Sequence, residues 1–257
     1  MLLCYITDRR QFPGDAAARR RRLLDKIAEA SRAGVNLIQL RERDLPAHDL
    51  ESLARDAVDA VRQNPLCSGS SAMAGLGAFR RSATRILINS RADIALASGA
   101  DGVHLRSDDI SPAEVRALWR KVAVHAAKAE GSGVAPAPET GNRQLETPSH
   151  CLISVACHSV SDVELARAQG ADIALFAPVF EKSGAPGVGL TALRDACRVV
   201  AGASMPVLAL GGVTLANARA CLQAGAAGIA AIRLFQENDV AEVVAALRAL
   251  AETETRN

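Results

Sequence analysis

The sequence is poor in aromatic residues. Only 3% of its 257 residues are Phe, Trp or Tyr, with a single Trp and a single Tyr among them. A core must therefore be built mainly from Ala, Val, Leu and Ile. No apolar run approaches the length of about 18 residues that a membrane span requires, so a membrane protein is not indicated.

The cysteines lack the spacing of a metal or redox motif. Six are present, none in a C-x-x-C pair, and most stand in apolar runs. We expect them to be reduced and buried in a cytoplasmic protein. The first ten residues, "MLLCYITDRR", carry their positive charge after the apolar run, which is the wrong order for a secretory signal.

The sequence also lacks an excess of one charge sign, because 30 Lys and Arg residues nearly balance 28 Asp and Glu residues and the formal net charge is only +2. Arginines are scattered or lie on helix-like segments such as "AAARRRRLLDK", which favours a solvated helix face. No nucleic-acid partner is indicated. The oligomeric state stays open, with a homo-oligomer among the alternatives.

One phrase recurs along the chain, in which a helical pattern ends at a glycine and a short apolar strand follows. It is seen in "AGVNLIQL", "SGADGVHL", "QGADIALF" and "AGAAGIAAI". Such units predict eight buried parallel strands, at about 2–7, 37–42, 85–90, 102–105, 152–158, 173–179, 206–211 and 228–233. Eight β/α units in a chain of this length predict a TIM barrel. The alternative, a doubly wound open sheet, is disfavoured because no G-x-G-x-x-G follows the first strand.

Two segments interrupt this rhythm. Residues 64–83 and 125–150 are rich in Gly, Ser, Ala and Pro, which predicts flexible insertions in a single domain spanning 1–257. Each falls between a helix and the following strand, on the face opposite the catalytic end of a barrel. We therefore expect neither to carry catalytic residues.

Side chains alternate along a strand, so each predicted strand presents one face to the helices and one to the interior. The apolar set of the second strand should meet the helices, which turns Gln39 and Arg41 inward and leaves Arg43 just beyond the strand end. Asn89 and His104 face inward on the next two strands. Asn89 has a second interpretation, as the cap of a short helix starting at Arg91.

The stretch "ISVACHSVSD" places a thiol beside an imidazole. Cys157 shares the helix-facing side with Ile153 and Val155, whereas His158 lies on the interior side at the rim. The two side chains therefore cannot act as a pair. A zinc site is not indicated either, since zinc requires three or four convergent ligands. A single working histidine is the better interpretation.

The last two strands end in features that suit a phosphate. Gly211 and Gly212 follow the seventh strand, and Ala231 and Ile232 end the eighth. Loops at these positions of a barrel commonly hold phosphate through backbone N–H groups. The glycine pair lets a ligand approach the backbone closely.

Motifs in order along nearly the whole chain resemble one known family. They are "YITD" (5–8), "IQLRER" (38–43), "LINSRADIAL" (87–96), "GADGVHL" (99–105), "ACHSVSDVELARAQGAD" (156–172), "FAPVF" (176–180) and "LALGGVT" (208–214). The sequence is similar to the thiamine phosphate synthase and thiazole tautomerase (TenI) superfamily. The resemblance implies a TIM barrel, a phosphorylated thiazole ligand and a role in thiamine biosynthesis.

The two branches of this superfamily differ in chemistry. The synthase joins hydroxymethylpyrimidine diphosphate to thiazole phosphate with Mg²⁺, whereas the tautomerase moves protons on a carboxythiazole phosphate without a metal. Where the synthase pattern has Asp, Lys and Ser, this sequence has Ser90, Arg43 and Ala156, and its loop 181–189 is also different. Asp109 matches the second magnesium carboxylate. "RER", "VFE" and the histidine resemble the tautomerase branch.

The favoured hypothesis is therefore a thiazole tautomerase, with His158 as general acid–base and no cofactor. Arg41, with Gln39, would hold the substrate carboxylate. The first alternative is the synthase, with Asp109 on Mg²⁺ and Arg41 and Arg43 on the diphosphate. The second is a barrel that binds thiazole or thiamine phosphate without catalysis.

Overall fold

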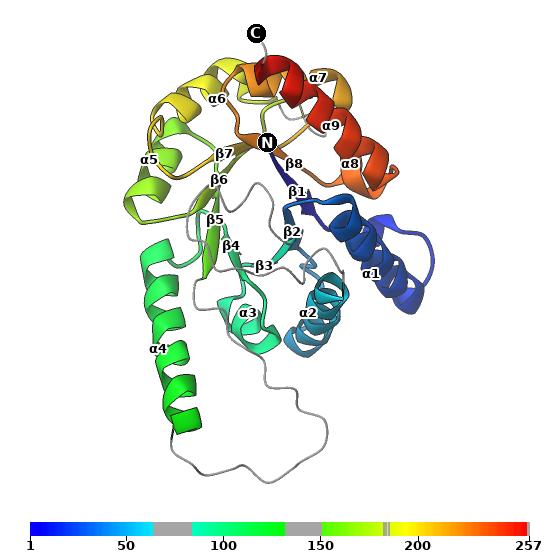
Figure 1. Cartoon of the computed structure of the whole chain (residues 1–257), viewed down its shortest axis with the longest axis vertical. Helices are drawn as coiled ribbons and strands as arrows, with labels where there is room; N and C mark the ends of the chain where they lie inside the picture. The colour runs from blue at the N-terminus through cyan, green and yellow to red at the C-terminus, as the bar shows by residue number, and fades with distance from the viewer. Residues whose placement is uncertain (64–83, 132–150, 182–183, 185, 256–257) are drawn as a thin grey trace.

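The structure is a computed structural model that describes residues 1–63, 84–131, 151–181, 184 and 186–255. Eight parallel strands form a closed barrel in which each strand pairs with its neighbours in sequence, and β8 closes onto β1. Figure 1 shows the strands at the centre and the helices around them. The predicted TIM barrel is confirmed.

All eight predicted strands are present, but several end earlier than expected. Their bounds are β1 Leu2–Ile6, β2 Leu37–Leu40, β3 Arg85–Asn89, β4 Gly102–Leu105, β5 Leu152–Cys157, β6 Ile173–Phe176, β7 Val207–Ala209 and β8 Gly228–Ala231. Arg41 and His158 consequently lie just beyond the strands and not in them. Their backbones belong to the loops at the carboxyl end of the barrel.

The helices fill the predicted gaps between strands. They are η1 Arg9–Gln11, α1 Ala16–Ala33, α2 Ala47–Arg62, α3 Ala92–Ser98, α4 Pro112–Gly131, α5 Val160–Ala168, α6 Gly189–Arg198, α7 Leu215–Gln223, α8 Arg233–Gln236 and α9 Val240–Thr255. The second insertion was predicted to begin at 125, which is wrong, because α4 continues to Gly131 (Figure 1). The Ala- and Lys-containing start of that segment favours helix. The first insertion and residues 132–150 lie outside the described residues.

The recurring glycines end their helices as predicted. Four of them have positive φ angles, namely Gly34, Gly99, Gly170 and Gly225. The polar residue before the next strand then ties that strand to the preceding one through a backbone N–H. Leu3 donates to Asn36, Ile86 to Asp101 and Ile153 to Asp172. These bonds fix the strand register at the amino end of the barrel.

Two apolar layers separate the inside of the barrel from its helical coat. The interior layer contains Leu2, Cys4, Ile6, Leu37, Leu87, Leu152, Ile173, Leu175, Leu208 and Ala230. The outer layer, between strands and helices, contains the alternate strand residues, including Ile38, Val103 and Cys157. The predicted alternation of helix-facing and interior-facing residues in β2 to β5 is therefore confirmed. Trp119 of α4 is buried in the same outer layer.

Cys157 is fully buried, and burial, with a smaller effect of Asp162, raises the pKa of its thiol to about 12. The described cysteines are all free thiols. Within the described part of the chain, no helix is long and apolar enough to cross a membrane.

Cys157→Ala should lower the free energy of unfolding by about 1 kcal/mol, because it removes a buried sulfur from the packing between β5 and the helices. Urea unfolding followed by circular dichroism measures this difference. A variant as stable as the wild type would show that the outer layer is loosely packed around this position.

Candidate active site

Polar side chains meet at the carboxyl ends of β2, β3 and β4, where the interior apolar layer stops. Gln39 on β2 is buried, and its Nε2 donates a 2.8 Å hydrogen bond to Asn89 Oδ1 on β3. The Oε1 atom of Gln39 is buried and accepts no hydrogen bond from any described residue. An unmet buried acceptor costs about 1–3 kcal/mol, which a structural role alone does not explain.

Asn89 continues this line of contacts toward solvent. Its Nδ2 donates to Ser90 Oγ at 3.0 Å. No side-chain bond caps α3 at Arg91, so the alternative interpretation of Asn89 as a helix cap is wrong. The amide is instead shared between Gln39 and Ser90. Ser90 has a φ of 57°, a left-handed conformation that is uncommon for a residue other than glycine.

Arg106, just after β4, completes the line. Its Nε donates to Ser90 Oγ at 3.1 Å, and its Nη2 lies 3.3 Å from Asp109 Oδ1. Its backbone N–H also donates to Asp109 Oδ2 at 2.7 Å. Burial acts to raise the pKa of Asp109, but the hydrogen bonds from Arg106 and Ser90 outweigh it and lower the pKa. Asp109 is therefore ionised and already engaged.

These residues fit a magnesium ion poorly. Magnesium needs oxygen ligands in near-octahedral geometry, usually with one or two carboxylates. Here a serine replaces one expected carboxylate, and the other, Asp109, contacts a guanidinium. Within the described ranges, no three His, Cys, Asp or Glu side chains converge as metal ligands.

Arg41 follows β2 and is half-buried. Burial, followed by the charge of Arg43, lowers its pKa, but a guanidinium stays protonated near neutral pH. No ion pair with a described residue involves Arg41. Its backbone N–H donates to the Thr7 hydroxyl, which in turn donates to the buried carboxylate of Glu42 at 2.6 Å. The backbone of Arg41 is thus held in place by Thr7, the residue that directly follows β1.

The Glu42 carboxylate is anchored on its other side by Arg9. The Arg9 Nη1 lies 3.1 Å from Glu42 Oε2, and the same guanidinium pairs with Asp44. Burial is the largest effect on Glu42 and raises its pKa, whereas the bonds from Thr7 and Arg9 act to lower it. The network holds the loops after β1 and β2 together.

A pocket of about 340 Å³ opens beside these loops. Its polar lining includes Glu42, Asn89 and Ser90 together with the arginines at 43, 91 and 106, and its apolar lining includes Leu40, Leu45 and Leu50. Arg91 and Arg106 are paired with acidic residues, so Arg43 supplies the positive charge that is unpaired among the described residues and favours an anionic ligand here. The predicted residues Arg43 and Asn89 both lie here.

His104 lies in the interior of the barrel on β4. It pairs in register with Ser154 of β5, and its Nδ1 lies 2.9 Å from the Ser154 hydroxyl. Burial lowers its pKa to about 3. Smaller effects come from Asp109, which acts to raise the pKa, and from Arg41, which acts to lower it. The ring is therefore neutral near pH 7. It is suited to hydrogen bonding and not to proton exchange with solvent.

His158 follows β5 directly and is exposed. Its Nδ1 lies 2.6 Å from the carbonyl oxygen of Ala177, which can only accept, so Nδ1 must carry the hydrogen. In the neutral ring, Nε2 then keeps a free lone pair. The backbone N–H of His158 donates to Asp162, which also closes a capping box with Ser159 at the start of α5. One ring nitrogen and the backbone of His158 are thus both held by hydrogen bonds.

Gly211 and Gly212 follow β7 with φ angles of 93° and 67°. None of the hydrogen bonds among described residues uses their N–H groups as donors. A Cβ on Gly212 would lie 2.8 Å from the Glu181 carbonyl oxygen, so packing against the loop after β6 also demands glycine. Ala231 ends β8, and Ile232 precedes α8.

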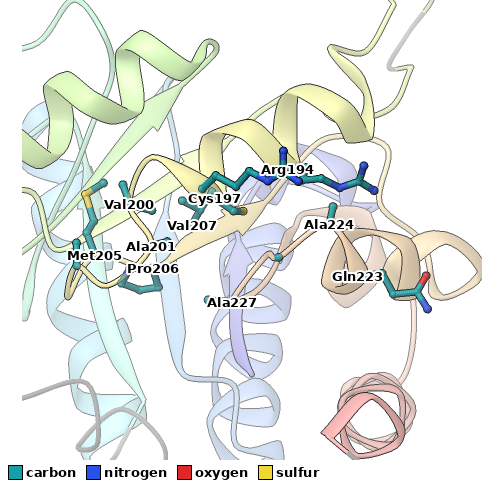
Figure 2. A pocket seen from close by; sticks show the side chains of 13 residues that line it. Arg194, Cys197, Val200, Ala201, Met205, Pro206, Val207, Gln223, Ala224 and Ala227 are labelled. Carbon is teal, nitrogen blue, oxygen red and sulfur yellow. The ribbon is translucent and has the colours of Figure 1, made fainter. Parts of the chain in front are cut away.

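A larger pocket, of about 640 Å³, lies at the other end of the barrel (Figure 2). Its lining includes Cys197 and Arg194 of α6, Val207 at the start of β7 and Ala227 before β8. These positions mark the amino ends of the strands. None of the predicted site residues lies there.

Sequence reasoning missed Ser154 and Arg106. Ser154 was on the predicted interior face, and pairing of β4 with β5 would have placed it opposite His104. Arg106 stands three residues before Asp109, a spacing typical of a local ion pair, but nothing in the sequence indicated that it also reaches Ser90.

A closed β/α barrel with polar and cationic side chains gathered at the carboxyl ends of its strands is the architecture of a TIM-barrel enzyme. The family described as thiamine monophosphate synthase (TMP-TENI) matches residues 71–131 and 133–235. The chain belongs to this family.

Individual relatives cover nearly the whole chain. A protein of Geobacter sulfurreducens named "Putative thiamine-phosphate synthase" is 36% identical, over 99% of this chain and 96% of its own. A thiamine-phosphate synthase of Roseiflexus castenholzii is 32% identical, over 90% of this chain and 79% of its own. The structure of a thiamine phosphate pyrophosphorylase from Pyrococcus furiosus has the same fold, with a TM-score of 0.67 at 23% identity, covering 98% and 96% of the two chains.

His104 should make stability fall in acid. Its pKa is about 3 in the folded protein and near 6.5 in the unfolded chain, so only the unfolded chain takes up the proton between these values. His104→Asn should therefore lose less stability than the wild type as the pH falls below about 6, by up to about 1.4 kcal/mol per pH unit. Urea unfolding at several pH values measures both slopes. Parallel curves would show that His104 protonates in the folded state.

Proposed function

We propose that the protein is a thiazole tautomerase that aromatises a carboxythiazole phosphate by proton transfer, with His158 as the general acid–base. The observation that carries this proposal is the environment of the imidazole. Its Nδ1 is committed to the Ala177 carbonyl oxygen, and the ring stands at the catalytic rim of the barrel. The free Nε2 is the atom that would take a proton from one carbon of the substrate and return one to another carbon at the far end of the conjugated system, so that the double bonds shift into the ring.

The rest of the site suits the substrate in this role. Arg41 would hold the carboxylate, because its guanidinium is half-buried and has no ion-pair partner among the described residues. Gln39 would orient Asn89 beside it. His104, being neutral, would contribute hydrogen bonding only. Arg43 would add positive charge at the mouth.

The phosphate would bind at the opposite side of the mouth. The backbone N–H groups of Gly211 and Gly212 would donate to it, together with the backbone at Ala231 and Ile232. Holding the phosphate there and the carboxylate at Arg41 would stretch the substrate across the barrel mouth, past His158. Proton transfer then needs no cofactor.

A second candidate function is thiamine phosphate synthase, which the names of the relatives favour. In that case Arg41 and Arg43 would contact the pyrimidine diphosphate, and Asp109 would be the one retained carboxylate for Mg²⁺. The ion pair between Arg106 and Asp109 argues against this assignment.

His158→Asn should lower the rate of tautomerisation about 10²–10⁴-fold with little change in ligand affinity, because asparagine keeps hydrogen bonding but cannot exchange protons near neutral pH. The assay follows the absorbance of the aromatic thiazole, with ligand affinity measured by calorimetry. Cys157→Ala is the matched control, since that neighbouring thiol faces the helices. Loss of turnover in the cysteine variant alone would sink the proposed mechanism.

Tautomerisation should continue unchanged in the presence of a chelator, and purified protein should form no more than traces of thiamine phosphate from the two synthase substrates with Mg²⁺. The reason is that the donor set around Asp109 does not suit the metal. Both activities are measured on one preparation by chromatography of the products. Robust synthase turnover that chelator abolishes would establish the second candidate.

A further inference from the structure

Arg106 bridges the two positions that carry the magnesium carboxylates in the synthase pattern. One position is Ser90, whose hydroxyl accepts from Arg106 Nε at 3.1 Å. The other is Asp109, whose carboxylate receives both the side chain and the backbone N–H of Arg106. A single guanidinium thus lies against both sites at once.

The charges around this guanidinium also balance. A divalent cation between two carboxylates gives a site without net charge. Here the serine removes one negative charge, and the arginine supplies one positive charge to the remaining carboxylate. Asp108 lies 3.3 Å from the same guanidinium but is largely exposed, so its contribution is screened by solvent.

We propose that the Arg106 guanidinium takes the place of the metal ion in this chain and contacts an oxyanionic group of the ligand directly. The side chain is suited to this because a guanidinium offers five N–H donors. Nε and Nη2 serve Ser90 and Asp109, whereas Nη1 makes no hydrogen bond or ion pair with a described residue. Arg106 also lines the 340 Å³ pocket.

The ligand class follows from the other charged residues that line that pocket. Glu42 is paired with Arg9. Arg91 is neutralised by Asp93, with which it makes a 2.6 Å contact. Arg43 is exposed and has no ion-pair partner among the described residues. A phosphoryl or carboxylate group in the pocket would be attracted by the charge of Arg43 and would accept hydrogen bonds from Nη1 of Arg106. The inference rests on the proposed function only in placing the ligand at this end of the barrel, and the group meant is the substrate carboxylate placed at Arg41, whose pKa is lowered by burial and then by the nearby Arg43.

The first test uses the wild-type protein and Mn²⁺ as the metal probe. Electron paramagnetic resonance counts bound and free Mn²⁺ directly, without turnover. We expect no stoichiometric binding at millimolar Mn²⁺ by the wild type. Combining Ser90→Asp with Arg106→Gly should create a site that binds Mn²⁺, and aspartate tolerates the left-handed backbone at position 90. If the wild type and the double variant bound Mn²⁺ equally, or if neither bound it, the proposal that Arg106 takes the place of the metal ion would be overturned.

The second test uses inorganic pyrophosphate as the oxyanion probe, with chelator present, by calorimetry. The wild type should bind it without metal. Arg106→Gln should weaken binding at least about 10-fold, because charge-assisted hydrogen bonds are lost. Arg106→Lys should fall between the two, since it keeps the charge but not the fork of donors.

Arg194→Gln is the control for the second test. It removes the same charge from the pocket at the opposite end of the barrel (Figure 2) and should leave pyrophosphate binding unchanged. Thermal melts check that each variant is folded. Wild-type binding that needs metal, or equal weakening by both glutamine variants, would contradict the proposal. Because neither test measures turnover, a protein that passes both but fails to tautomerise would reject the proposed function alone.

Discussion

In a closed eight-stranded barrel every strand has two neighbours, so a slip of one residue in any strand would turn its interior side chains toward the helices. This constraint decides what each polar residue of the site can touch. It places Gln39 beside Asn89 and His104 beside Ser154, and it separates Cys157 from His158. From the Gln39–Asn89 pair, side-chain hydrogen bonds continue outward through Ser90 to Arg106 and Asp109.

Much of this arrangement could be predicted from the sequence because it depends on alternation alone. The eight strands, their glycine-terminated helices and the inward direction of Gln39 and His104 follow from a period of two and from left-handed caps. Strand ends could not be placed to the residue, since the barrel's last hydrogen bonds depend on neighbouring loops. The end of α4 was misplaced because residues 125–150 were judged as one segment by their Gly, Ser, Ala and Pro content, whereas the first of them are alanine-rich and favour helix.

The contacts that long side chains make could not be predicted from the sequence. An arginine side chain can reach in many directions from one backbone position, so nothing in "HLRSDD" distinguishes a surface ion pair from a bridge to β3. The same applies to Arg9, whose guanidinium joins Glu42 and Asp44 across two loops. Asp109 on its own suggested a residual metal site. In the structure this carboxylate is paired with Arg106, which the sequence did not indicate.

The scarcity of aromatic residues has a spectroscopic consequence. The sequence has a single tryptophan, Trp119, which lies on α4 and is buried in the outer apolar layer of the barrel. Its fluorescence therefore reports on one contact, the seating of α4 against the strands, and is distant in the chain from the histidine and the glycine pair. A change in emission on heating would register the detachment of that helix even while the barrel mouth remained intact. Tryptophan fluorescence therefore reports on the packing of α4, whereas ligand binding reports on the mouth of the barrel.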